Sequence, residues 1–241
     1  MASPKFKHLL LDLDGTLIYS GSILVHVDFL WRMIPYMKKR YGWKASWKAL
    51  KEGGQVLKSP TPGAKSNHER LVDVFSRNLM ITKEEAETSI VQSLKEVFPR
   101  LKNHFGTIKG AADFVNWARD HYTLTLATNP VWKAEFVKMR MIWGGIDPED
   151  FKSITTSDRM HSVKPTPEYY REILSQEGFK PEDCLLVGNE RKMDLPATEV
   201  GISVFLLRPA ANEMTCIQEQ TGNTGAAWRG NFQHLRSFLT A

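Results

Sequence analysis

The chain has 241 residues, of which 42% are hydrophobic and 24% charged, a composition typical of a globular protein and not of a disordered one. This length allows one large domain, or one domain with a substantial insertion. The formal net charge is +5, and the two cysteines are too few for a disulfide framework. Cys184 is expected in a buried strand and Cys216 in a loop, both as reduced thiols.

The first predicted element is a buried strand over residues 6–11, which leads into Asp12, Asp14 and the turn residue Gly15. A continuous apolar run of this kind is typical of a parallel strand covered on both faces. Because ligands of open α/β sheets bind beyond the carboxyl ends of the strands, the two carboxylates indicate a site. They approach one centre if the extended geometry continues, and diverge if the turn begins early. The simpler alternative is a strand that ends in a polar turn.

Two unpaired carboxylates at this spacing would repel each other, and a hard cation such as Mg²⁺ would remove the conflict. One aspartate could then act as a nucleophile and the other as an acid and base. We find a resemblance to the first motif of the haloacid dehalogenase (HAD) superfamily in Asp12-Leu13-Asp14-Gly15-Thr16-Leu17. The resemblance implies that Asp12 is the nucleophile and Asp14 the acid and base. It also implies an all-helical cap domain over residues 20–105, inserted into a core domain of residues 1–19 and 106–241.

The insertion is predicted to be helical throughout. Pro35 should kink or end its first helix, and Gly53-Gly54 and residues 59–63 are expected to break the chain between helices. Thr82 and Glu85 form a capping box that opens the last helix. The predicted helices cover residues 23–41, 43–50, 67–79 and 82–99. The resemblance implies that this cap closes over the catalytic centre.

The insertion is also the basic part of the chain. Between Leu17 and Thr107 there are 15 Lys and Arg against 8 Asp and Glu, whereas the remainder has 17 against 19. The asymmetry could attract a phosphorylated substrate, a nucleic acid or an anionic membrane, or could be a solvated Lys-rich surface. From Trp31 to Lys51, aromatic residues alternate with Lys and Arg, as in helices that lie on membranes. The favoured interpretation is that cap helices bury these aromatic rings against one another while the lysine stems cover apolar surface.

After the insertion, a strand over residues 122–128 ends in Thr128 and Asn129. It resembles the second HAD motif, which implies that the Thr128 hydroxyl and nearby amides hold the transferring phosphoryl group, with Asn129 also binding phosphate. Asn129 before Pro130 could equally cap the helix predicted over residues 133–141.

Lys164 follows a short strand predicted over residues 153–157 and precedes a helix that should open with Thr166 as cap and Pro167 as first residue. Its position matches the third HAD motif, which implies that Lys164 neutralises the charge of the nucleophile and the phosphoryl group. A lysine here would otherwise be an ordinary exposed residue. The nearby His161 is expected to be structural or solvated.

A buried strand over residues 183–188 is followed by Asn189, Glu190 and Asp194, which resembles the fourth HAD motif. Asn189 stands where that motif has an acid. An amide oxygen can still bind Mg²⁺, with one negative charge fewer. The implied metal ligands are Asp12, Asp14, Asn189 and Asp194.

Further along the chain, the pattern predicts a helix over residues 195–200 capped by Gly201, a strand over 202–207 and a closing helix over 235–239. Five or six strands separated by helices predict a doubly wound, mostly parallel α/β sheet, the Rossmann-like core that the resemblance also implies.

The predicted function is Mg²⁺-dependent hydrolysis of a small phosphate monoester through an aspartyl phosphate. Asp14 favours a phosphatase over a dehalogenase, because displacement of a halide needs no acid for the leaving group. Two alternatives stay open: a phosphomutase, and a catalytically weak protein whose basic cap binds an anionic partner. We expect a phosphorylated metabolite as partner rather than nucleic acid, no membrane span, a cytoplasmic location, and a monomer or homodimer.

Overall fold

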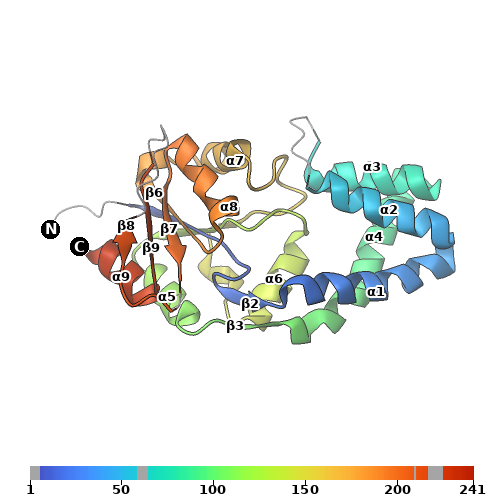
Figure 1. Cartoon of the computed structure of the whole chain (residues 1–241). Helices are drawn as coiled ribbons and strands as arrows, with labels where there is room; N and C mark the ends of the chain where they lie inside the picture. Colours follow the sequence, from blue (N-terminus) through green and yellow to red (C-terminus); the bar gives the residue numbers. More distant parts are fainter. Residues whose placement is uncertain (1–5, 59–64, 209, 217–224) are drawn as a thin grey trace.

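The computed structural model describes residues 6–58, 65–208, 210–216 and 225–241, and within them a seven-stranded sheet forms the centre of the molecule (Figure 1). The strand order is β5-β4-β1-β6-β7-β9-β8, and every pairing is parallel except that of β8 with β9. The strands are β1 (His8–Leu11), β4 (Thr123–Leu126), β5 (Ser153–Ile154), β6 (Cys184–Gly188), β7 (Ser203–Leu207), β8 (Thr215–Cys216) and β9 (Ala227–Gly230). The predicted mostly parallel sheet is therefore confirmed.

Helices cover both faces of the sheet. The side chains of β1, which point alternately to the two faces, pack against helices on each of them. Leu9 and Leu11 join one apolar cluster, which includes residues of α5 (Ala111–Ala118), α6 (Ala134–Trp143) and α9 (Phe232–Thr240). Leu10 faces the other side and packs in a second cluster with α7 (Pro167–Glu177) and the 3₁₀ helix η4 (Leu195–Val200). Because successive side chains of a strand point to opposite faces, a strand between two helical layers must be apolar throughout.

A segment made of four α-helices lies between the short strands β2 (Ile18–Ser20) and β3 (Phe105–Thr107), which pair antiparallel. We call it the helical segment. Figure 1 shows it extending away from the sheet, on the side opposite α9. Its helices are α1 (Ser22–Tyr41), α2 (Trp43–Val56), α3 (Asn67–Leu79), α4 (Lys83–Val97) and the 3₁₀ helix η1 (Phe98–His104). The capping box of Thr82 and Glu85 at the start of α4 is confirmed.

One predicted interruption of the helical segment is wrong, and another is decided in part. Pro35 lies inside α1, so it does not end the helix, which was one of its two predicted effects. Gly53 and Gly54 lie inside α2, which continues to Val56. A Cβ at Gly53 would lie only 2.8 Å from Cδ1 of Leu71 on α3, so the glycine allows α2 and α3 to approach closely. The predicted break over residues 59–63 lies outside the described residues.

Two other interpretations change after the helical segment, those of Cys216 and Asn129, whereas the helix predicted over residues 195–200 is confirmed. Cys216 belongs to β8 rather than to a loop, although it is exposed. The helix predicted over residues 195–200 is present as a 3₁₀ helix, and the left-handed Gly201 ends it as expected. Asn129 is not a helix cap, because α6 begins at Ala134 with Lys133 as its N-cap residue. Strand β9 has no counterpart among the predicted elements.

The amino-terminal end of α3 connects the helical segment to the core. The backbone amides of Asn67 and His68 donate to the carbonyls of Met160 and Ser157, each at 2.8 Å. The His68 ring contacts Glu87, whose carboxylate also accepts a hydrogen bond of 2.8 Å from Lys133 in the core. Both parts of the chain are therefore joined through backbone bonds and an ionic contact.

Candidate active site

Asp12 and Lys164 meet at the carboxyl end of β1, in the centre of the sheet. The Lys164 ammonium donates to Oδ1 of Asp12 and to Oδ1 of Asp194, both at 2.8 Å. All three side chains are buried, and Asp12 is only 8% exposed. The Thr16 hydroxyl lies 3.0 Å from the second oxygen of Asp12. The predicted convergence of Asp12, Lys164 and Asp194 is thus present, although they come from three distant parts of the sequence.

One ammonium is shared by two buried carboxylates, Asp12 and Asp194. Burial raises the pKa of Asp12 to about 6, because the attraction of Lys164 only partly offsets desolvation while the nearby Asp194 adds repulsion. Burial also disfavours the charged form of Lys164, but Asp12 and Asp194 outweigh it and raise the pKa of Lys164 well above its ordinary value. The lysine therefore stays protonated at neutral pH, and the centre carries a cation suited to hold an anionic group.

Asp14 does not join this cluster. Its Oδ2 accepts a hydrogen bond of 2.7 Å from Nη1 of Arg140, a residue of α6 that is 5% exposed. The turn begins directly after β1, so the two aspartates diverge, which is the second of the two arrangements that their spacing allowed. No pattern in the sequence singled out Arg140, because a single arginine in an amphipathic helix is normally a surface residue.

Thr128 and Asn129 follow β4 and lie next to the same centre. Thr128 is buried, and its carbonyl accepts hydrogen bonds from the hydroxyls of Thr155, at 2.7 Å, and Tyr169, at 2.8 Å. Oδ1 of Asn129 accepts a bond of 3.3 Å from the backbone amide of Lys164. These contacts fix the loop after β4 against the loop that carries the lysine. The supporting hydroxyls of Thr155 and Tyr169 were not among the predicted site residues.

The loop after β6 brings Asn189 and Asp194 to the centre. Oδ1 of Asn189 lies 3.1 Å from the Thr16 hydroxyl, and the second oxygen of Asp194 accepts a 3.0 Å bond from the amide of Glu190. Two glycines make the close approach possible. A Cβ at Gly15, which has a φ of +79°, would lie 2.3 Å from Nδ2 of Asn189, and one at Gly188 would lie 2.2 Å from Oδ2 of Asp194.

The donor chemistry of the centre suits Mg²⁺, which prefers oxygen ligands and commonly keeps several waters or phosphate oxygens. Oδ1 of Asp14 is buried and has no hydrogen-bond partner among the described residues, so it is an acceptor open to a cation. Those residues contain no group of three or more acidic, His or Cys side chains placed to hold a metal. Oxygen donors are thus present at the centre, and the Lys164 ammonium lies between two of the predicted ligands, Asp12 and Asp194.

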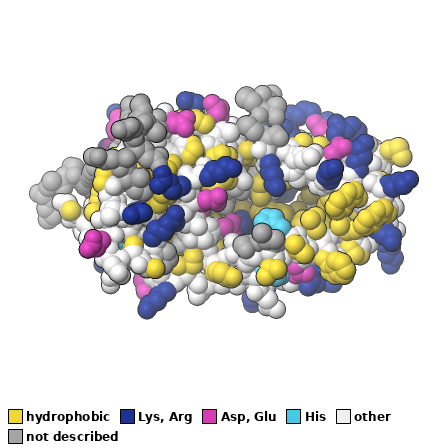
Figure 2. Space-filling view, in the orientation of Figure 1, with side chains coloured by type: hydrophobic (Ala, Val, Ile, Leu, Met, Phe, Trp, Pro, Cys, Tyr) yellow, Lys and Arg dark blue, Asp and Glu magenta, His cyan; other side chains and the backbone are white. Residues whose placement is uncertain are grey.

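A cavity of about 320 Å³ lies beside Asp14, between the core and the helical segment. The core contributes Asp14, Arg140 and Trp132, and the helical segment contributes Phe29 and Phe98. The Trp132 ring packs edge-on against both phenylalanines, with centroids 5.4 and 5.2 Å away. The face drawn in Figure 2 is hollowed between these two parts of the molecule. The wall of the cavity is mixed, because Ser20, His26, Asn129 and Glu190 also line it.

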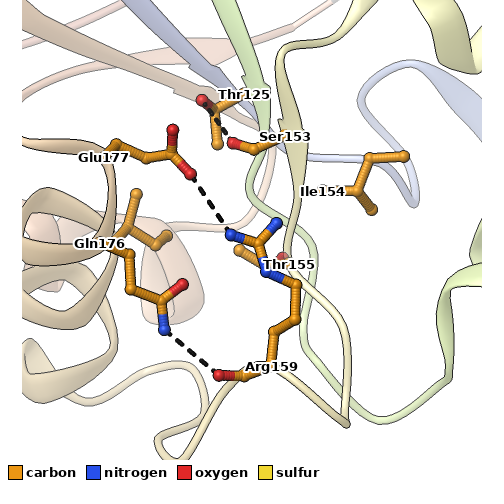
Figure 3. Close-up of a pocket in the computed structure, with 8 residues that line it drawn as sticks. Thr125, Ser153, Ile154, Thr155, Arg159, Gln176 and Glu177 are labelled. Carbon is orange, nitrogen blue, oxygen red and sulfur yellow. Dashed lines mark hydrogen bonds and ion pairs between the residues drawn. The ribbon is translucent and has the colours of Figure 1, made fainter.

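A second recess lies at the β4–β5 edge of the sheet, where Arg159 and Glu177 form an ion pair of 3.6 Å (Figure 3). Its volume of about 10 Å³ has room for roughly one water molecule. None of the predicted site residues lines it, so it is not part of the candidate active site.

The family model of the haloacid dehalogenase-like hydrolases matches residues 6–199, which include every predicted site residue. The chain belongs to this family. Among curated proteins, no significant match to this HAD-like hydrolase is found.

Solved structures of HAD proteins share the fold over nearly the whole chain. A HAD phosphatase from Thermococcus onnurineus is 18% identical, with a TM-score of 0.58 and coverage of 97% of this chain and 98% of that one. A 2-haloacid dehalogenase from Pseudomonas syringae is 15% identical, with a TM-score of 0.64 and 98% coverage of both chains. A protein described as a HAD-hydrolase, YfnB from Bacillus subtilis in a magnesium-bound form, is 16% identical, with a TM-score of 0.54 and coverage of 98% and 100%. At such identities the likeness shows the fold alone.

Proposed function

We propose that this HAD-like hydrolase is a Mg²⁺-dependent phosphatase that acts on a small phosphate monoester through an aspartyl phosphate at Asp12. The observation that supports it most is the buried contact of Lys164 with Asp12. A carboxylate at the end of the central strand is oriented by a cation that can also neutralise the charge of an incoming phosphoryl group.

In the proposed reaction, an oxygen of Asp12 attacks phosphorus and the ester oxygen leaves, which gives the aspartyl phosphate. Asp14 donates a proton to the leaving oxygen and then accepts one from the water that hydrolyses the intermediate. Lys164, the Thr128 hydroxyl and Asn129 hold the phosphoryl oxygens. Catalysis then depends mainly on positioning and on charge neutralisation.

Asp12, Asp14, Asn189 and Asp194 are the residues that would hold Mg²⁺. When bound, the ion would supply positive charge that neutralises the carboxylates and the phosphate oxygens. Burial raises the pKa of Asp12 to about 6, and additional positive charge would favour the ionised form of this carboxyl group.

We further propose that residues 20–105 act as a cap domain over a core of residues 1–19 and 106–241, and that the leaving group occupies the cavity between them. The aromatic walls formed by Phe29, Phe98 and Trp132 favour a compact leaving group with an apolar part. The partner is accordingly a small phosphorylated metabolite.

The test is a screen of phosphate monoesters with Mg²⁺, in which released phosphate is measured for the wild type and for Asp12→Asn. We expect no release from the variant and normal release from the control Asp120→Asn, whose carboxylate is exposed and remote from the site. EDTA should abolish the activity and added Mg²⁺ should restore it. Turnover by Asp12→Asn would remove the covalent mechanism, and full activity in EDTA would remove the metal. An isomerised phosphate ester without released phosphate would indicate a phosphomutase instead.

A further inference from the structure

Helix α1 is apolar on two opposite sides. Met33 and Met37 face the interior of the helical segment and are almost completely buried. Leu24, Val27 and Trp31 recur at spacings of three and four residues on the opposite side, and Trp31 is 78% exposed. A stripe of large apolar side chains along a helix normally packs against another surface. The outer side of α1 therefore lacks the cover that its composition calls for.

Helix α2, which packs against α1, also carries exposed apolar side chains. Trp43 and Trp47 are 52% and 44% exposed, and their rings stack with centroids 6.1 Å apart. We call the exposed apolar residues of the two helices the aromatic face. Its members are Leu24, Val27, Leu30, Trp31, Tyr36, Trp43 and Trp47. Figure 2 shows hydrophobic side chains gathered over the helical segment, with Lys and Arg around them. The expectation that helices of the segment bury these tryptophans against one another is thus wrong for all three.

The charge around the aromatic face is strongly positive. Helices α1 and α2 together carry seven Lys and Arg against two acidic residues, Asp28 and Glu52. Arg32 pairs with Asp28 at 2.8 Å, and Lys48 lies 3.9 Å from Glu52. Within the described part of the chain, the remaining five cations have no carboxylate partner. They are Lys38, Lys39, Arg40, Lys44 and Lys51.

We infer that the aromatic face docks on the surface of an anionic lipid bilayer. Tryptophan and tyrosine rings favour the boundary between lipid headgroups and acyl chains, aliphatic side chains enter the acyl region, and Lys and Arg are attracted to anionic headgroups. The aromatic face and its surrounding cations supply all three kinds of side chain: aromatic, aliphatic and positively charged. The contact is peripheral, because no described helix is long and apolar enough to cross a membrane.

The same observations argue against two other occupants. A second copy of this chain would bring two surfaces of the same positive sign together, which is electrostatically unfavourable. A single-stranded nucleic acid would be attracted by the cations and could stack on the tryptophans. It would, however, make no use of Leu24 and Val27, which offer aliphatic surface and no ring for stacking.

The experiment is sedimentation of the full chain with vesicles of phosphatidylcholine alone, and with about 30% phosphatidylserine, at low and high salt. We expect binding to the anionic vesicles only, weakened by salt, with a blue shift of tryptophan fluorescence. The triple variant Trp31→Ser, Trp43→Ser and Trp47→Ser should lose both signals. The matched control is Met80→Ser with Ile142→Ser, which removes exposed apolar side chains elsewhere.

A second pair of variants tests the charge. Lys44→Gln with Lys51→Gln should weaken binding about 25-fold, because each cation near an anionic surface contributes about fivefold. The control variant, Lys109→Gln with Lys180→Gln, removes two exposed lysines of the core. It should change binding to the anionic vesicles little. Melting curves check that each variant is folded.

Three results would overturn the inference. The first is absence of wild-type binding to anionic vesicles at low salt, and the second is binding that survives the loss of the three tryptophans. The third is a preference for another occupant: a dimer in solution that the triple variant dissociates, or tighter binding to a single-stranded oligonucleotide than to vesicles. Each outcome is independent of whether the chain hydrolyses phosphate esters.

Discussion

Nη1 of Arg140 lies 2.7 Å from Oδ2 of Asp14, so a buried guanidinium on α6 holds the second aspartate of the first motif. The two partners differ in burial, because Arg140 is 5% exposed whereas the Asp14 side chain is 37% exposed. Removal of the Asp14 carboxylate should therefore change the free energy of unfolding by a different amount from removal of the Arg140 guanidinium.

We expect Asp14→Ala to lower the free energy of unfolding by about 3 kcal/mol, because it leaves a buried cation without its carboxylate. Arg140→Met should cost much less, since the partly exposed Asp14 can be hydrated. The double variant should recover most of the stability lost in Asp14→Ala. Urea unfolding of the three variants measures this cycle. Equal losses in the two single variants would show that burial does not decide the effect.

The raised pKa of Asp12 makes a prediction for stability against pH. A carboxyl that binds its proton more tightly in the folded state than in the unfolded state stabilises the fold below its unfolded pKa, near 4. That contribution is lost as the pH rises through the folded pKa of about 6. Without added metal, Asp12→Asn should therefore gain up to about 3 kcal/mol relative to the wild type between pH 4 and pH 7. A difference between the two proteins that stays constant with pH would contradict the raised pKa.

Lys164→Met should be among the most destabilising substitutions in the core. It removes the cation from between Asp12 and Asp194 and leaves two buried carboxylates facing each other. We expect a loss of about 3–5 kcal/mol at pH 8, measured by urea unfolding, and a smaller loss at pH 5, where a proton replaces the lysine charge. The control Lys7→Met removes a lysine paired at the surface with Asp183 and should cost less than about 1 kcal/mol.

Gly53 and Gly54 form a matched pair within α2. A Cβ at Gly53 would lie 2.8 Å from Leu71 and 3.0 Å from Phe75, whereas one at Gly54 would have no heavy atom within 4 Å. Gly53→Ala should therefore lower the free energy of unfolding by about 1–3 kcal/mol through overpacking. Gly54→Ala should raise it by about 0.5–1 kcal/mol, because alanine favours the helix. Thermal unfolding measures both, and stabilisation by both changes would show that α2 and α3 do not pack closely.

Local sequence determined the strand at β1, most of the helices, the N-caps of α4 and α7, and the loops that carry Asp12, Thr128, Lys164 and Asn189. Hydrophobic periodicity and capping are local properties, so they can be read along the chain. The sequence also predicted that these four loops converge, because parallel strands bring their carboxyl ends to one edge of the sheet.

Only the tertiary structure decided which side chains pair. Gly53-Gly54 has the local signal of a helix break, yet packing against α3 keeps α2 continuous. Arg140 and Asp14 are 126 positions apart, and no local pattern couples them. Whether Trp31 is buried likewise depends on what lies against α1. The composition of the helical segment predicted that Trp31 is buried, whereas the structure shows that it is exposed. Local propensity involves only neighbours along the chain, whereas burial and charge pairing are set by residues that the fold brings together from far apart.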